Sequence, residues 1–166
     1  LIDLIALTLK PDSAEHFALA GEGNSPYDIA ALWRRRRLDR LARLRARHYG
    51  YVLQTGGLLP FLSVGENIAL PQRVAGRLDR GVVRDLAERL GILDQLGARP
   101  GKVSGGQRQR AAIARALAHR PPIVLADEPT ALLDPVNAAV VMDLFMDLVA
   151  RFGVALVLVT HDPLEA

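Results

Sequence analysis

Apolar residues along this chain of 166 residues recur with two spacings, which predict two kinds of element. A spacing of three to four residues is typical of helices with one buried face, and short alternating or continuous runs are typical of strands. Predicted helices cover residues 1–9, 58–70, 82–93 and 135–152, and two more begin at residues 25 and 104. Predicted strands cover residues 15–20, 49–53, 123–126 and 155–159, and the last is apolar throughout, as expected of a strand covered on both faces. Because strands alternate with helices, we expect an α/β fold with a mostly parallel sheet.

Three of the predicted helices begin with a local signal. Ser63 followed by Glu66 has the pattern of a capping box, in which each side chain bonds the backbone N–H of the other residue. Asp134 is a good N-cap, and Pro135 favours the first helical position. Ser104 is a further N-cap, and the two glycines after it allow close approach to a helix start that favours an anion such as phosphate.

Two adjacent carboxylates follow the apolar run at residues 123–126. This pattern predicts a buried strand that delivers Asp127 and Glu128 to the C-terminal edge of the sheet. Asp127 is suited to Mg²⁺, which takes one or two carboxylates and keeps several waters. Glu128 points differently and can act as a base or orient a water molecule. The alternative interpretation is that the two acids cap the next helix or lie in solvent.

The composition bounds the class of protein. The length fits a single domain with its own core, and the absence of Cys excludes disulfides and Cys-based zinc sites. No apolar run approaches the roughly 18–20 residues that cross a bilayer, and the first residues lack a signal-peptide pattern, so we expect a soluble cytosolic domain. A net charge of only +3 does not argue for nucleic-acid binding.

Arginine is concentrated in one part of the chain, between residues 34 and 47. Two interpretations of this segment stay open. It forms a basic surface for a phosphate-rich partner, or it is the solvated face of a helix whose other side carries Leu38, Leu41 and Leu44. The arginines are Arg34, Arg35, Arg36, Arg37, Arg40, Arg43, Arg45 and Arg47.

Five motifs, in their order along the chain, resemble those of the ATP-binding cassette (ABC) ATPases. They are Gln54 as the Q-loop, Ser104-Gly105-Gly106-Gln107 as the signature, Asp127-Glu128 as the Walker B pair, Leu133-Asp134 as the D-loop and His161 as the switch. The resemblance implies a P-loop NTPase-like sheet flanked by helices, with a small helical subdomain. It divides the chain into residues 1–54 for the core, 55–103 for the helical subdomain and 104–166 for the signature helix and later motifs.

The resemblance also implies a role for each motif. Gln54 and Asp127 would bind Mg²⁺, and Glu128 and His161 would act on the attacking water and the γ-phosphate. The signature would close over ATP held by a second cassette in a head-to-tail dimer, with Ser104 and the Gly106 amide against the γ-phosphate. Its residues are Val103, Ser104, Gly105, Gly106 and Gln107, with Val103 at a position where Leu is usual. Asp134 would serve the D-loop, and its interpretation as a helix N-cap stays open beside that role.

One motif of the family is missing from the sequence. A phosphate loop requires G-x-x-x-x-G-K-[ST], but the lysines are Lys10 and Lys102, and neither lies in that pattern. Residue 1 aligns just after that loop in the family, so we expect a partial cassette truncated at both ends, with a degenerate cassette as the alternative. We therefore expect this chain alone to be inactive as an ATPase.

The function implied by the resemblance is that of the ATP-binding subunit of an ABC transporter, which hydrolyses ATP to drive transport through a membrane partner. The segments 58–61 and 66–68 resemble the lipoprotein-releasing and macrolide-efflux type of cassette. Implied cofactors are ATP and Mg²⁺. Implied partners are a second cassette and a transmembrane permease subunit, with no direct contact to nucleic acid, and the implied location is cytoplasmic, at the inner face of the cell membrane. The alternatives are a soluble cassette that acts on ribosomes or nucleic acid, and an inactive pseudo-cassette.

Overall fold

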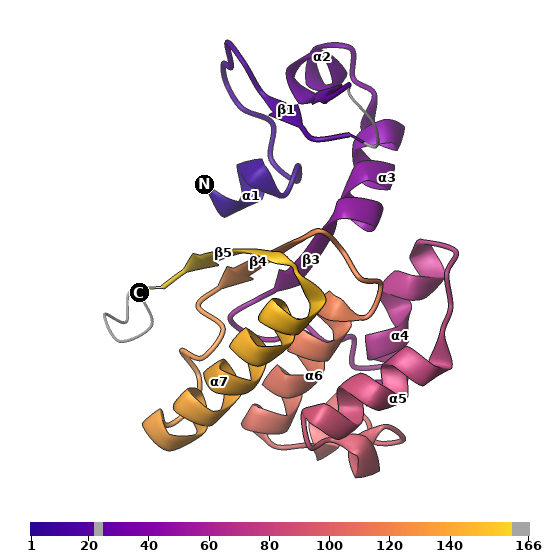
Figure 1. Cartoon of the computed structure of the whole chain (residues 1–166), viewed down its shortest axis with the longest axis vertical. Helices are drawn as coiled ribbons and strands as arrows, with labels where there is room; N and C mark the ends of the chain where they lie inside the picture. Colours follow the sequence, from indigo (N-terminus) through magenta and orange to yellow (C-terminus); the bar gives the residue numbers. More distant parts are fainter. Residues whose placement is uncertain (22–24, 161–166) are drawn as a thin grey trace.

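A parallel sheet lies at the centre of the computed structural model, which describes residues 1–21 and 25–160 (Figure 1). Its strands are β3 (Tyr49–Val52), β4 (Ile123–Asp127) and β5 (Ala155–Val159), in the spatial order β3-β4-β5. Tyr51 pairs with Leu125, and Leu125 pairs with Val157. The predicted α/β fold with a parallel sheet is therefore confirmed.

Helices cover both faces of this sheet, as Figure 1 shows. Strand residues alternate between the faces, so Val52, Val124 and Ala126 point to one side, and Tyr51 and Leu125 point to the other. The first side packs against α4 (Val64–Val74), α5 (Arg80–Arg89), α6 (Gly105–Leu117) and α7 (Pro135–Phe152), joined by the short 3-10 helices η1 (Leu93–Gln95) and η2 (Pro100–Lys102). The second side packs against α1 (Ile2–Ile5) and the region of β1 (Ala18–Leu19), β2 (Tyr27–Asp28), α2 (Ile29–Arg34) and α3 (Leu38–His48).

The largest apolar cluster lies on the side of α4 to α7. Ile68, Leu86, Ile113 and Phe145, one from each of these helices, are fully buried in it. The capping box predicted at Ser63 and Glu66 starts α4. Residues 58–62 were predicted to be helical as well, but they precede the helix. The prediction of a helix over residues 82–93 is shifted, since α5 begins at Arg80 and ends at Arg89.

The predicted first helix, over residues 1–9, is wrong in length, because α1 ends at Ile5. Leu7 has a φ of 58°, in the left-handed region, and the N–H groups of Thr8 and Leu9 both bond the carbonyl of Asp3. A left-handed residue ends a helix and satisfies its last carbonyls in this way. The residue that extended the apolar spacing to position 9, Leu9, is 56% exposed, whereas Leu7 is buried in the turn.

The helix predicted to begin at residue 25 begins later, at Ile29. Tyr27 and Asp28 pair as β2 with β1, and the Asp28 side chain accepts a hydrogen bond of 2.8 Å from the N–H of Ala31, so that it caps α2. The arginine run then bends at Arg36, whose φ is 52°, before α3 begins. In α3, Leu41 and Leu44 are buried as predicted, whereas Leu38 is 59% exposed.

Strand β5 is less covered than its apolar sequence predicts. Its burial runs from exposed Ala155 through three intermediate residues to Val159, which is 38% exposed. Apolar packing is nevertheless present on both of its faces, since Leu156 and Leu158 pack against the main cluster and Val157 packs against the cluster on the opposite face. Among the described residues, β5 pairs with a strand on one side only. Within the described part of the chain, no helix has the length and apolarity that crossing a membrane requires.

Candidate functional site

Polar residues gather where β3 and β4 end. Parallel strands bring their carboxyl ends to one edge of a sheet, so Gln54 after β3 lies close to Glu128 after β4. The Gln54 Nε2 donates a hydrogen bond of 3.2 Å to the Glu128 Oε2, and Asp127 is the last residue of β4. The structure thus brings together Gln54, Asp127 and Glu128. His161, predicted for the same edge after β5, lies outside the described residues.

Glu128 has an unusual backbone. Its φ is 45°, a left-handed conformation that is uncommon for a residue with a side chain. The Glu128 N–H donates a hydrogen bond of 2.8 Å to the carbonyl of Val159, the last residue of β5. Strain of this kind is concentrated at active sites and ligand clamps, because the surrounding structure must hold it in place. The backbone therefore sets the Glu128 carboxylate in a direction that a regular strand end would not give it.

Tyr51 and Asp3 lie on the face of the sheet that α1 covers, next to Asp127. Burial raises the pKa of the Tyr51 phenol to about 12, with a further contribution from the carboxylates of Asp3 and Asp127. The phenol is hydrogen-bonded to Asp3, which lies in α1. Neither Tyr51 nor Asp3 was identified in the sequence, because their proximity depends on how α1 packs on β3. The alternation along 49–53, which places Tyr51 on one face, was the only local signal.

The turn that carries Gln54 is fixed by side chains of α6. The guanidinium of Arg115 donates to the carbonyls of Gly57 and Gly56, at 2.7 and 2.8 Å, and the Gln109 Nε2 lies 3.4 Å from the carbonyl of Leu53. Gly56 and Gly57 have φ values of 71° and 56°, which glycine adopts at little cost. Burial lowers the pKa of Arg115. Arg115 was not identified in the sequence, since nothing local distinguishes it from the surface arginines.

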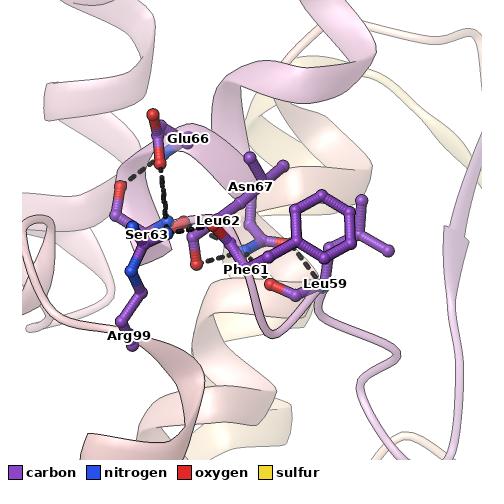
Figure 2. Close-up of polar contacts among 7 residues, drawn as sticks. All are labelled: Leu59, Phe61, Leu62, Ser63, Glu66, Asn67 and Arg99. Atoms are coloured by element: carbon purple, nitrogen blue, oxygen red, sulfur yellow. Dashed lines mark hydrogen bonds and ion pairs between the residues drawn. The ribbon is translucent and has the colours of Figure 1, made fainter.

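The loop between this turn and α4 is fixed by one buried amide, as Figure 2 shows. The Asn67 Oδ1 accepts from the N–H of Leu59 at 2.7 Å, and its Nδ2 donates to carbonyls of Leu59, Leu62 and Ser63. The Arg99 guanidinium bonds the carbonyl of Phe61 from outside. These contacts hold the loop in one conformation, with Phe61 68% exposed at its tip.

The predicted signature segment begins α6. Ser104 accepts from the Gln107 N–H at 3.2 Å, and the Gln107 side chain accepts from the Ser104 N–H at 2.9 Å, so the two form a capping box. Val103 is buried and anchors the segment. A side chain added at Gly106 would meet nothing within 4 Å, and one added at Gly105 would lie 4.0 Å from Leu133. The packing of this chain therefore does not itself require either glycine.

Asp134 lies beside the signature segment, next to Leu133, and caps α7. Its Oδ1 accepts from the N–H of Asn137 at 3.2 Å, and its Oδ2 accepts from the Asn137 side chain at 2.7 Å. These hydrogen bonds lower the pKa of the exposed Asp134 carboxyl. The structure bears out the predicted N-cap. A role of Asp134 in the D-loop would have to use the same carboxylate that caps α7.

The donor set at the sheet edge fits a hard cation. Asp127, Glu128 and the amide oxygen of Gln54 supply oxygen ligands, and Mg²⁺ binds through one or two carboxylates while it keeps several waters. Within residues 1–21 and 25–160, no group of three His, Cys, Asp or Glu side chains is placed to enclose a metal ion. A site of this kind suits a cation that is shared with a bound phosphate.

Comparison with known proteins agrees with the resemblance found in the sequence. Residues 8–131 match the family described as ABC transporter. The lipoprotein-releasing system ATP-binding protein LolD 1 of Rhodospirillum rubrum is 44% identical over 128 residues, which are 75% of this chain and 57% of that protein. The corresponding LolD protein of Paramagnetospirillum magneticum is 40% identical over 166 residues, 98% of this chain and 69% of that protein.

A solved structure agrees as well. A dimeric ATP-binding cassette in a post-hydrolysis state, bound to ADP and Pi, superposes with a TM-score of 0.81 at 31% identity. The superposition covers 99% of this chain and 70% of that chain. By contrast, this chain spans only about half the length of several curated relatives that it matches, 57% in one case and 47% in another.

Proposed function

This chain belongs to the ABC transporter family, and we propose that it forms part of an ATP-binding subunit that hydrolyses ATP to drive transport through a membrane partner. The observation that carries the proposal is the contact of 3.2 Å between the Gln54 amide and the Glu128 carboxylate, beside Asp127 at the edge of the sheet. Proteins of this family bind ATP. The similarity to LolD proteins favours the lipoprotein-releasing type of cassette.

We assign the residues at the sheet edge to the cation and the attacking water. Asp127 and the Gln54 carbonyl would hold Mg²⁺, which neutralises charge on the phosphates when it is bound. Glu128 would orient a water molecule or accept its proton, since its carboxylate lies within reach of Gln54 and its backbone is held by β5. His161 would complete this edge. These roles follow from the family's motifs at the matching positions of this sequence.

We assign the signature segment to a second cassette. Gly105 and Gly106 leave the start of α6 uncovered, and a helix start favours a phosphate. Ser104, Gly106 and Gln107 would therefore face ATP that is held by the partner cassette, with Val103 as their anchor and Asp134 at the same interface. The solved dimeric cassette with the same fold supports this arrangement.

The residues of this chain do not supply the phosphate cradle. The sequence contains no G-x-x-x-x-G-K-[ST] segment, and its lysines are Lys10 and Lys102. We propose that this chain alone binds ATP weakly and does not hydrolyse it. Each charge-assisted hydrogen bond that the cradle would supply is worth about 1.5–3 kcal/mol, so several missing bonds weaken binding by orders of magnitude.

The membrane partner, in our proposal, docks against the segment between Gln54 and the signature. A largely apolar groove of about 510 Å³ runs along β3 between α1 and α4, and Leu53, Leu70, Pro71 and Val74 line it. Its position next to Gln54 would let a docked segment of a permease affect the nucleotide site. The subunit would then lie in the cytoplasm, at the inner face of the membrane.

Calorimetric titration with Mg-ATP tests the nucleotide site in the chain as it exists. We expect a dissociation constant above about 1 mM for the wild type, because the cradle is missing and few strong phosphate contacts remain. Micromolar binding by the chain alone, unaffected by Asp127→Asn and Glu128→Gln, would place the nucleotide elsewhere and refute the assignment.

A mixing experiment tests the signature. The chain is combined with an ATP-binding cassette that has an intact phosphate loop but a disrupted signature, and size-exclusion chromatography measures the heterodimer with and without ATP. We expect an ATP-dependent heterodimer with the wild-type chain and none with Gly106→Val. Gly97→Val is the control, because Gly97 also has open space around it but lies outside the signature. Equal dimer formation by both variants would contradict the proposal.

A further inference from the structure

The positive charge of the chain is concentrated on α2 and α3. Residues 34–47 carry eight arginines against one acid, Asp39, and hence +7, whereas the whole chain carries +3, which leaves −4 for all other residues. On α3, Arg40, Arg43 and Arg47 are exposed at helical spacing, and Leu41 and Leu44 on the other side are buried. This helix is therefore amphipathic, with a basic outer face.

Part of this basic face meets a second element that is also basic. Arg43 and Arg47 of α3 and Arg77, just after α4, line one cavity of about 230 Å³, together with His119. None of the residues that line this cavity is acidic. Burial lowers the pKa of His119, so that its ring adds no positive charge near pH 7. Three arginines from two separate elements thus line one cavity.

Several of these arginines have interactions of their own, and Arg47 is one of them. Arg45 donates to the carbonyl of Leu7 at 2.6 Å, and Arg43 lies 3.9 Å from Asp39 in a pair whose arginine side chain is 82% exposed. Exposed pairs of that kind contribute little. Basic residues near the C-terminal end of a helix are favourable, and this accounts for Arg47 on α3, but not for Arg77, which lies outside α3 and lines the same cavity.

The walls of the cavity are apolar on one side. Val74 and Ala75, at the end of α4, line it, and Val74 is 66% exposed. Ala46, Val74 and His119 also line the apolar groove along β3, so the basic cavity and the apolar groove are neighbours that share part of their lining. An arginine cluster beside an exposed apolar wall matches a ligand that carries a phosphate group next to an apolar part. A duplex nucleic acid would offer phosphates to the arginines but no apolar group to pack against this wall.

We propose that Arg43, Arg47 and Arg77 form a binding site for the phosphate of anionic phospholipid headgroups at the membrane surface. The site is distinct from the ATP site, which lies at the ends of β3 and β4. Guanidinium groups bind phosphate oxygens in a planar, two-pronged geometry, and basic amphipathic helices bind anionic leaflets. The proposal rests on the proposed function in one respect, because a permease docked in the adjoining groove would hold this face against the bilayer.

Vesicle flotation with the whole chain tests this site without ATP or a permease. Vesicles of phosphatidylcholine alone are compared with vesicles that contain phosphatidylglycerol. We expect the wild type to float only with the anionic vesicles and Arg43→Gln/Arg47→Gln/Arg77→Gln to lose about 100-fold in partitioning, because each arginine near an anionic surface contributes about fivefold. Arg80→Gln/Arg84→Gln/Arg151→Gln removes the same charge from exposed positions elsewhere, and we expect less than a threefold loss from it.

Four results would overturn the proposal. Equal losses in the two triple variants would show a nonspecific charge effect, and equal flotation with both kinds of vesicle would show that phosphate charge is not recognised. Displacement by inorganic phosphate at constant ionic strength, or a stronger dependence of duplex DNA binding on the same three arginines, would assign the site to another ligand. Circular dichroism monitors folding, and Arg43→Gln/Arg77→Gln replaces the triple variant if that variant unfolds. A failure of ATP binding would leave the vesicle result unchanged, so the two proposals are tested separately.

Discussion

Residues 49–160 and the described residues before them differ in how they are held together. The later part packs around one continuous apolar cluster between the sheet and α4 to α7. The earlier part forms two small clusters against the opposite face of the sheet. Buried polar side chains occur with and without partners in both parts. In the later part, Gln72 bonds the carbonyl of Ala118 and the N–H of Asp79, but the buried Arg110 Nε has no partner among the described residues. In the earlier part, the buried indole N–H of Trp33 has no acceptor there either.

The comparison teaches that the two parts are specified by different means. In the later part, packing around one continuous apolar cluster decides how the segments are arranged. In the earlier part, local turns and caps such as Asp28 decide where elements begin and end. The described residues that we propose for the ATP site all lie in the part with the larger core.

The largest expected effect comes from a change in the main core. Phe145 is fully buried in α7, and Phe145→Ala should lower the free energy of unfolding by about 3–5 kcal/mol. Leu41→Ala, in the smaller cluster, should cost nearer to 2 kcal/mol, because a small cluster can close up around the space. Urea denaturation measures both. A larger loss for Leu41 would show that the small cluster is the better packed of the two.

A smaller effect is expected from the buried polar groups. Asn67→Ala leaves backbone groups of the loop before α4 without partners and should cost about 2–3 kcal/mol. Trp33→Phe removes an N–H that has no acceptor in the described structure and should change stability by less than about 1 kcal/mol. Thermal melts compare the two variants, and the exposed Asn137→Ala serves as the control. If Trp33→Phe were the more harmful change, the difference assigned to these two buried groups would be wrong.

Helix caps should have similar effects in the two parts. Ser104→Ala removes the cap of α6, and Asp28→Ala removes the cap of α2, and each should cost about 1 kcal/mol. Ser13→Ala, at an exposed position outside any helix, is the control. Chemical denaturation gives the three values. A much larger cost for Asp28 would mean that the earlier part depends on its caps more than on its clusters.

The smallest effects concern two exposed carboxyls and their dependence on pH. The hydrogen bond from Arg37 lowers the pKa of Asp39, and hydrogen bonds from Asn137 lower the pKa of Asp134, each from an ordinary value of 3.8. A lowered folded-state pKa means that the stabilisation is present above pH 3.8 and is lost as the pH falls through the folded-state value. Melting temperatures of Asp39→Asn and Asp134→Asn should therefore approach the wild-type value on acidification.

Salt distinguishes the two carboxyls. The pair of Asp39 with Arg37 is an exposed ion pair, so 1 M NaCl should remove its contribution. The hydrogen bonds between Asp134 and Asn137 involve one charge and should persist. The same melts, repeated at both salt concentrations, measure this. An equal response to salt at the two positions would contradict the assigned causes.

Local signals predicted much of the later part and less of the earlier part. The strands at 49–53, 123–126 and 155–159 and the helix at 135–152 were predicted nearly to the residue, because apolar runs and strong caps coincide there. The end of α1 was not predicted, since Leu7 adopts its left-handed conformation where its carbonyl meets Arg45. Pairing of Tyr27 with Leu19 was missed for the same reason, because it depends on a partner in another segment.

Some contacts of the candidate site could be predicted from the sequence and others could not. The proximity of Gln54 to Glu128 follows from the parallel order of strands, and the capping box of Ser104 follows from the sequence itself. The left-handed backbone of Glu128, the hydrogen bond between Tyr51 and Asp3, and the two bonds from Arg115 to Gly56 and Gly57 do not. Each of these depends on how segments far apart in the chain pack.

The parallel sheet has a consequence for the order in which the chain folds. Tyr49 pairs with Ile123, and Ile123 pairs with Ala155, so every pairing in this sheet must close a long loop that contains at least one whole helix. The capping boxes at Ser63 and Ser104, by contrast, join residues three positions apart. Loop closure costs entropy before any pairing is gained, so α4 and α6 should form early and the strands should join late. During synthesis, β3 leaves the ribosome long before its neighbour β4 exists, and in that interval its apolar side chains depend on helices or chaperones for cover.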